Sequence, residues 1–176
     1  MPKKESNEAI TIMSVRNLRR SIKIGWTAGI DEYEVNFHDN PLKSFYDALD
    51  ALKPHVCALC ELHARDAEKI SVTGITCRYS GEQTNALIVA RKVIKKGKRV
   101  FNITTPLLPM YEDEANKSVD HMEEDQAKAV EAVISEATKY LGGERAQGQI
   151  QFEDPKGPDE EESNTAKFPE LKEAGA

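Results

Sequence analysis

The sequence predicts an α+β domain built on a mainly antiparallel sheet of about six strands, followed by a disordered acidic tail. Three observations lead to this fold class. Apolar and polar residues alternate along several short segments, as in strands with one buried face. Two longer segments repeat apolar residues every three or four positions, as helices do. From residue 144 onward the chain is rich in Pro, Gly and acidic residues, which favours disorder. We therefore expect one domain over 1–143 and a tail over 144–176.

Three strands are expected before the first helix, over residues 9–15, 18–26 and 32–37. Residues 28–31 (AGID) are typical of a turn in which Gly29 takes a positive φ. The first helix is then expected to begin at Asn40 and Pro41, with the asparagine as its cap and the proline at its first position.

The first helix has an apolar stripe that runs through residues 45, 49, 52, 56 and 59, and Cys60 continues it. Pro54 interrupts the pattern, so the helix kinks or restarts there. The stripe passes through HVCALCELH (55–63), a segment that resembles half of a metal site. One helix cannot supply four tetrahedral ligands, and a redox thiol would follow a strand. We therefore interpret Cys57 and Cys60 as buried structural thiols, with no metal.

Three more strands are expected after this helix, over residues 68–79, 86–94 and 99–105. Gly74 indicates a bulge in the first of them, and Gly97 a tight turn between the other two. A second helix is expected over 119–141, capped by Asp120 with Glu123 and ended by the two glycines that follow. The predicted order is β-β-β-α-β-β-β-α, with no internal repeat in the sequence. Its first part matches the order of an OB-fold, but a plain sheet with helices on one face fits as well, and we favour the plain sheet.

The net charge of −6 hides a division between two parts of the chain. Residues 1–105 carry 17 Lys and Arg against 12 Asp and Glu, a balance of +5, whereas residues 106–176 carry 7 against 18, a balance of −11. A basic body with an acidic tail is typical of a nucleic-acid-binding protein, although acidic tails also serve solubility. No apolar run reaches the length of a membrane span and no export signal stands at the start, so we expect a cytoplasmic protein.

Enzymatic motifs are absent from the sequence. It has no Gly-rich phosphate loop and no nucleophile elbow, and nothing in it calls for a cofactor. Asp31, Glu32 and Glu34 resemble a nuclease metal site, but the two glutamates alternate with apolar residues, as an exposed strand face does. The sequence therefore favours a non-catalytic protein.

Two basic clusters are the candidate DNA-binding residues, with single-stranded DNA slightly favoured. The first contains Arg16, Arg19, Arg20 and Lys23, and the second contains Arg91, Lys92, Lys95, Lys96, Lys98 and Arg99. The alternative is that the second cluster protects a sheet edge from aggregation. Four aromatic residues, Trp26, Tyr33, Tyr79 and Phe101, could stack on bases if they faced outward, but their positions in the strand pattern favour the core.

The segment QGQIQF, just past the second helix, fits the pattern Q-x-x-[LI]-x-F. It resembles the peptide by which bacterial replication and repair proteins dock on the sliding clamp. The resemblance implies that Ile150 and Phe152 enter an apolar pocket and that Gln147 hydrogen-bonds at its rim. The host sliding clamp is therefore an expected partner.

Residues 41–152 also resemble a family of short, uncharacterised phage and prophage proteins, through SFYDALDALKPHVCALCEL, VTGITCRY, ALIVARK, FNITTPLLP and ERAQGQIQF. The resemblance implies a phage origin in a bacterial host cell and transfers no catalytic residue. Two functions follow. The first is a DNA-binding accessory protein of phage replication or recombination, whose acidic tail inhibits binding or recruits partners. The second is a protein-interaction module, such as an anti-defence or host-takeover factor, that acts on a host protein.

Overall fold

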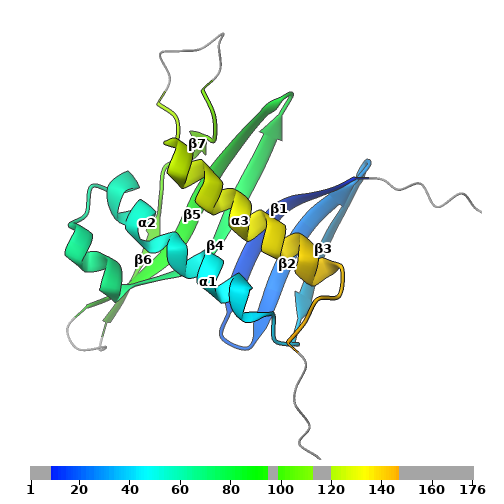
Figure 1. Cartoon of the computed structure of the whole chain (residues 1–176), viewed down its shortest axis with the longest axis horizontal. Helices are drawn as coiled ribbons and strands as arrows, with labels where there is room; N and C mark the ends of the chain where they lie inside the picture. The colour runs from blue at the N-terminus through cyan, green and yellow to red at the C-terminus, as the bar shows by residue number, and fades with distance from the viewer. Residues whose placement is uncertain (1–8, 95–98, 113–119, 147–176) are drawn as a thin grey trace, which may run out of the picture. The chain divides into compact units, whose positions relative to one another are not determined.

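The computed structural model describes residues 9–94, 99–112 and 120–146 (Figure 1). The elements, in chain order, are β1 (Ile10–Leu18), β2 (Ser21–Ala28), β3 (Asp31–Phe37), α1 (Lys43–Ala51), α2 (Lys53–Leu59), the 3₁₀ helix η1 (Ala64–Lys69), β4 (Ile70–Ser80), β5 (Gln83–Ile94), β6 (Arg99–Thr104), β7 (Leu108–Pro109) and α3 (Glu124–Leu141). The chain divides into two units between Ala146 and Gln147. The second unit lies outside the described residues.

The sheet is antiparallel throughout, in the order β3-β2-β1-β4-β5-β6, and β7 pairs with β5 beside β6. This confirms the predicted α+β fold with a mainly antiparallel sheet. Within the described part of the chain the sheet is open, with β3 and β6 at its two edges, so it does not close into the barrel of an OB-fold.

The helices lie on one face of the sheet, where α1 and α3 pack side by side (Figure 1). Alternate residues of the strands point into this layer, and the fully buried side chains include Val15, Ile24, Ile75 and Ile88. The other face of the sheet carries no helix among the described residues, so its side chains are open to a partner. No helix in the described ranges is both long enough and apolar enough to cross a membrane.

Several predicted boundaries are wrong for identifiable reasons. The segment 18–26 is not one strand, because Arg19 and Arg20 form a two-residue turn between β1 and β2. Both have negative φ, so the turn needs no glycine to mark it. The first helix begins at Lys43, and neither Asn40 nor Pro41 caps it.

The predicted restart of the first helix is confirmed, because α2 begins at Lys53 with Pro54 in its first turn. The second helix begins at Glu124, five residues later than predicted, and its capping box joins Glu123 to Gln126. The predicted cap by Asp120 is therefore wrong. The helix ends as expected at Gly142, and Gly143 takes a φ of 99°.

The fold repeats itself, although the sequence showed no repeat. The first half contains the three-stranded meander β1–β3 followed by helices α1 and α2, and the second contains the meander β4–β6 followed by helix α3. The order of strands in the sheet is symmetric about the junction of β1 with β4. The β1–β2 pairing is irregular between Ile12 and Ser14, and the β4–β5 pairing between Val72 and Gly74. These two bulges are sixty residues apart, as are Val15 and Ile75, which face each other at the junction. The two halves are thus related by an approximate two-fold axis through that pair.

Gly74 permits the two halves to meet. A Cβ at this position would lie 1.9 Å from the Val15 carbonyl oxygen and 3.1 Å from the Arg16 Cα. The strands approach so closely over only three residue pairs, from Ser14 opposite Thr76 to Arg16 opposite Gly74. The predicted bulge at Gly74 is therefore confirmed, and its role is a close backbone contact.

Candidate nucleic-acid interface

The open face of the sheet carries a set of arginines. Side chains alternate between the two faces along a strand, and residues paired across neighbouring strands point to the same face. Arg16, Arg78 and Arg91 therefore lie on the face opposite the buried side chains. Arg16 lies opposite Lys23 on β2, Arg78 opposite Asn85 on β5, and Arg91 opposite Ser71 on β4. The strands thus place three guanidinium groups from β1, β4 and β5 on one surface.

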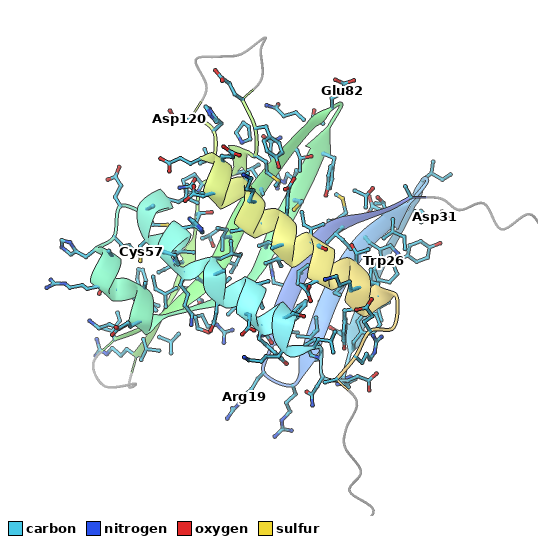
Figure 2. All side chains as sticks on the ribbon, viewed as in Figure 1. Arg19, Trp26, Asp31, Cys57, Glu82 and Asp120 are labelled. Atoms are coloured by element: carbon cyan, nitrogen blue, oxygen red, sulfur yellow. The ribbon has the colours of Figure 1, made fainter. Side chains whose placement is uncertain are left out.

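Further arginines lie at one end of this sheet. Arg19 and Arg20 occupy the β1–β2 turn, and antiparallel pairing places the end of β5 and the start of β6 at the same end. Figure 2 shows Arg19 projecting at this end, while Glu82 in the β4–β5 turn and Asp31, the first residue of β3, lie at the opposite end. Arg91 and Arg99, the described arginines of the second cluster, therefore lie toward the same end of the sheet as Arg19 and Arg20, and Glu82 and Asp31 lie at the other end. We call Arg16, Arg19, Arg20, Arg78 and Arg91 the arginine surface.

Ion pairing separates the lysines of the described chain from its arginines. All seven described lysines lie within 4.0 Å of a carboxylate, at positions 23, 43, 53, 69, 92, 128 and 139. Of the eight described arginines, only Arg145 forms an ion pair with another described residue. Among the described residues, the cations without a carboxylate partner are thus all guanidinium groups, which suit bidentate contacts with phosphate.

Arg16 is the most constrained member of the arginine surface. Its guanidinium donates to the Ile75 carbonyl at 2.9 Å and to Thr76 Oγ1 at 2.8 Å, both across the β1–β4 junction. Burial lowers the pKa of Arg16, and its described partners are all neutral groups. Because no described carboxylate lies beside this guanidinium, its charge makes the electrostatic potential at the centre of the open face more positive.

A pocket of about 460 Å³ lies at the arginine end of the sheet. We call it the fork pocket because β1 and β4 separate there, beyond the Arg16–Gly74 pair. Its basic and polar lining residues are Asn17, Arg19, Arg20, Ser21, His38, Asn40, Ser71, Thr73 and Arg91, and Tyr46 of α1 supplies an aromatic ring. The acidic lining residue, Asp39, is bonded to Arg145 at 3.2 Å. The pocket therefore unites arginines from both predicted clusters.

The remaining predicted cations within the described residues are Lys23, Lys92 and Arg99, which are ion-paired or lie on the helix side of the sheet. Lys23 is on the open face but bonds Glu34 at 2.8 Å. Lys92 points toward the helix layer, where it bonds Asp66 of η1 at 2.8 Å. Arg99 is exposed at the start of β6, and its register places it on the helix side.

Several predicted positions fall outside the described residues. They are Lys95, Lys96, Gly97 and Lys98 of the β5–β6 connection and Gln147, Ile150 and Phe152 of the docking peptide.

The aromatic residues do not form a base-stacking platform on the arginine surface. The rings of Trp26 and Tyr33 stack on each other with their centroids 5.4 Å apart, and both lie on the helix side of the sheet. The expectation that all four aromatics are core is wrong, because Tyr33, Tyr79 and Phe101 are exposed at the periphery of the helix layer. Helices α1 and α3 cover the centre of the sheet and leave these outer positions uncovered.

The end of the β5–β6 hairpin is apolar on both faces. Val93 and Ile94 are each 40% exposed, and Val100 and Phe101 are each 60% exposed. A second pocket, of about 480 Å³, lies on the helix side of this hairpin beside Cys60 and Leu62. This surface suits an apolar protein partner better than a nucleic acid.

Of the two cysteines predicted to be buried, Cys57 is buried and Cys60 is only partly buried. Cys57 is buried in the core and Cys60 packs against it at the end of α2, partly exposed (Figure 2 labels Cys57). Burial raises the pKa of both thiols, which keeps them protonated. Within the described ranges, no group of three or more His, Cys, Asp or Glu side chains is arranged to hold a metal ion.

Sequence reasoning missed two parts of this interface. Arg78 was not selected, although its alternation with Cys77 and Tyr79 placed it on the solvent face of its strand. The fork pocket has no sequence signal, because it arises from the divergence of strands that are far apart in the chain. Comparison with known protein families, curated proteins and solved structures finds no match to this chain.

Proposed function

We propose that this chain is a non-catalytic, DNA-binding accessory protein of phage replication or recombination, acting in the bacterial cytoplasm. The observation that carries the proposal is the arginine surface. Five guanidinium groups without a described carboxylate partner lie on the open face of the sheet and in the β1–β2 turn, and helices cover the opposite face. Arg78 lies near the Glu82 end of the sheet, and the other four lie toward the centre and the opposite end. Phosphate contacts by such groups release counterions and supply affinity without sequence specificity. The phage setting rests on the resemblance of residues 41–152 to phage proteins.

A salt series on labelled DNA tests this proposal. Arg19→Ala/Arg20→Ala/Arg91→Ala should lower affinity and make the slope of log affinity against log salt shallower by about 0.7 to 0.9 per lost phosphate contact. The control removes the same charge from the helix side, as Lys43→Ala/Arg65→Ala/Lys128→Ala. It should keep wild-type affinity and slope. Equal losses in both variants would show that only net charge matters, and no wild-type binding at low salt would refute the proposal.

The tail has a proposed role in the same function. Residues 147–176 carry 8 acidic and 3 basic residues, a balance of −5. The described chain ends at Ala146, whose amide donates to the carbonyl of Asn40, a residue of the fork pocket. An acidic segment that follows this point in the sequence can compete with DNA for the arginines. Deleting 147–176 should tighten DNA binding at low salt, and unchanged or weaker binding would exclude autoinhibition.

The host sliding clamp is the proposed partner of the tail peptide. Immobilised, purified clamp should retain the full chain, and Phe152→Ala should abolish that retention because the aromatic anchor is lost. Gln149→Ala is the matched control, since position 149 is not fixed in the motif. Failure of the unaltered chain to bind the clamp would refute the proposal that this segment is a clamp-docking peptide.

A protein-interaction module is the second candidate, and the apolar end of the β5–β6 hairpin favours it. Phe101 is 60% exposed beside a pocket of about 480 Å³. This function predicts that one host protein binds the purified chain stoichiometrically in the absence of DNA and is lost on Phe101→Ser. Its control is Tyr111→Ser, a comparably exposed aromatic position before α3.

A further inference from the structure

The sheet opens at both ends of the β1–β4 junction. These strands pair over three residues, whereas β1 pairs with β2 over eight and β4 with β5 over ten. Beyond Arg16 and Gly74, the end of β1 and the start of β4 separate, and the approximate two-fold symmetry creates a corresponding fork at the opposite end. Each fork exposes two strand edges that have no strand between them.

Among the described hydrogen bonds, a side chain of β1 or β4 spans one of the two forks and not the other. At the acidic end, the Tyr79 hydroxyl of β4 donates to the Ile12 carbonyl of β1 at 2.9 Å. The residue equivalent to Tyr79, sixty positions earlier, is Arg19, which is exposed and donates no described hydrogen bond across its fork. The basic end of the sheet is thus left with the fork pocket, while a tyrosine bridges the other end.

The charge of the fork pocket selects an anion. Arg19, Arg20 and Arg91 line it, and none of them pairs with a described carboxylate. Asp39 is held by Arg145, whose guanidinium also stacks over the Tyr140 ring at 4.1 Å. That arrangement fixes Asp39 and offsets its charge, so the cations of the pocket remain available to phosphate.

The neutral groups of the pocket suit a base. Asn17, Asn40 and Ser71 offer donors and acceptors, and Tyr46 offers a ring that is 39% exposed. A volume of about 460 Å³ lies within the range of small-ligand pockets, about 300 to 1,000 Å³, and holds one unpaired nucleotide rather than a duplex. Stacking of bases on aromatic rings beside a basic groove is the usual mode of single-strand recognition.

We propose that the fork pocket binds one nucleotide of single-stranded DNA, with its phosphate against Arg19, Arg20 and Arg91 and its base against Tyr46. This inference rests on the proposed DNA-binding function and deepens it, because it assigns the strandedness of the ligand and a binding site for the base. It gives Tyr46, which carries no charge, a role that the arginine surface alone does not require.

The test is fluorescence anisotropy with labelled dT12 and a 12-base-pair duplex, at two salt concentrations. Tyr46→Ala should weaken dT12 binding by about 5- to 100-fold without changing the salt slope, because stacking releases no counterion. Tyr46→Phe should bind like the wild type, since the ring is kept. Phe101→Ala, an exposed aromatic on another surface, is the control and should leave dT12 binding unchanged. Thermal melts establish that each variant is folded.

The outcomes separate the two proposals. Binding of dT12 that falls in Tyr46→Ala and returns in Tyr46→Phe supports the pocket. Salt-dependent binding that is equal for dT12 and duplex, and indifferent to Tyr46→Ala, overturns the pocket and leaves the arginine surface as a general DNA-binding face. If the wild type binds neither DNA at low salt, the proposed function itself fails. Loss of dT12 binding in both Tyr46 variants would assign the hydroxyl, not the ring, and would also overturn the stacking proposal.

Discussion

Gly74→Ala should separate the two halves of the sheet. The added Cβ would lie 1.9 Å from the Val15 carbonyl oxygen, 2.9 Å from the Val15 carbonyl carbon and 3.1 Å from the Arg16 Cα. All three are backbone atoms of β1, so no flexible side chain can move aside. The strands must part by roughly 1 Å before the contact becomes tolerable.

The cost follows from what crosses the junction. A displacement of this size breaks hydrogen bonds across the junction, among them the Arg16 bonds to the Ile75 carbonyl at 2.9 Å and to Thr76 Oγ1 at 2.8 Å. Hydrogen bonds from a charged group contribute about 1.5 to 3 kcal/mol and backbone bonds about 1 kcal/mol. We therefore expect a loss of about 3 to 5 kcal/mol, a large share of the roughly 5 to 15 kcal/mol that stabilises a domain.

Urea unfolding followed by circular dichroism measures this loss, with Gly81→Ala as the control. Gly81 also has a positive φ, of 62°, but a Cβ there meets no atom within 4 Å. The control therefore carries backbone strain of about 1 to 2 kcal/mol without a clash. If Gly74→Ala lowers the free energy of unfolding by no more than Gly81→Ala does, the close approach of β1 to β4 is not what requires glycine, and the reasoning fails.

Three further predictions concern titratable groups. Burial raises the pKa of Tyr79 to about 12, so the stability that its neutral hydroxyl contributes is complete below pH 10 and is lost as the pH rises to 12. Thermal melts of Tyr79→Phe as a function of pH should lack that decline. A hydrogen bond from Lys92 lowers the pKa of Asp66, so the stability that the Asp66–Lys92 pair contributes holds above pH 3.8 and is lost as the pH falls. Acid unfolding of Asp66→Asn should therefore depend less on pH than that of the wild type. An unchanged profile would exclude a stabilising role of this pair. Cys60 is partly exposed, whereas Cys77 is buried and burial raises its pKa to about 11. Ellman's reagent should therefore modify Cys60 first and Cys77 only on unfolding. The reverse order would contradict the packing of these side chains.

The strands and helices were predictable because each buries one face. The alternation through Ile22 and Ile24 and the stripe through Phe45 and Leu49 follow the buried residues of the structure. These patterns depend on residues two to four positions apart, so they survive without knowledge of tertiary contacts. The fold class could therefore be read from the chain.

The candidate site was harder to predict because it depends on pairing between distant segments. Lys92 looked like its neighbour Arg91, but the pleat directs it to the opposite face, where Asp66 of η1 neutralises it. The Arg19–Arg20 turn was hidden because its residues keep ordinary φ values. Charge density along a sequence locates basic segments, but only the sheet register and the ion pairs show which cations remain for a ligand.

The repeated architecture has a consequence for how the chain folds. Each meander joins strands that are neighbours in the sequence, so both can form early through short loop closures. The step that unites them must bring Arg16 to Ile75, 59 residues away, while α3 docks on α1. We expect the entropy of closing that long loop to set the folding rate. Mutations at the junction should then slow folding, whereas mutations within either meander should mainly speed unfolding.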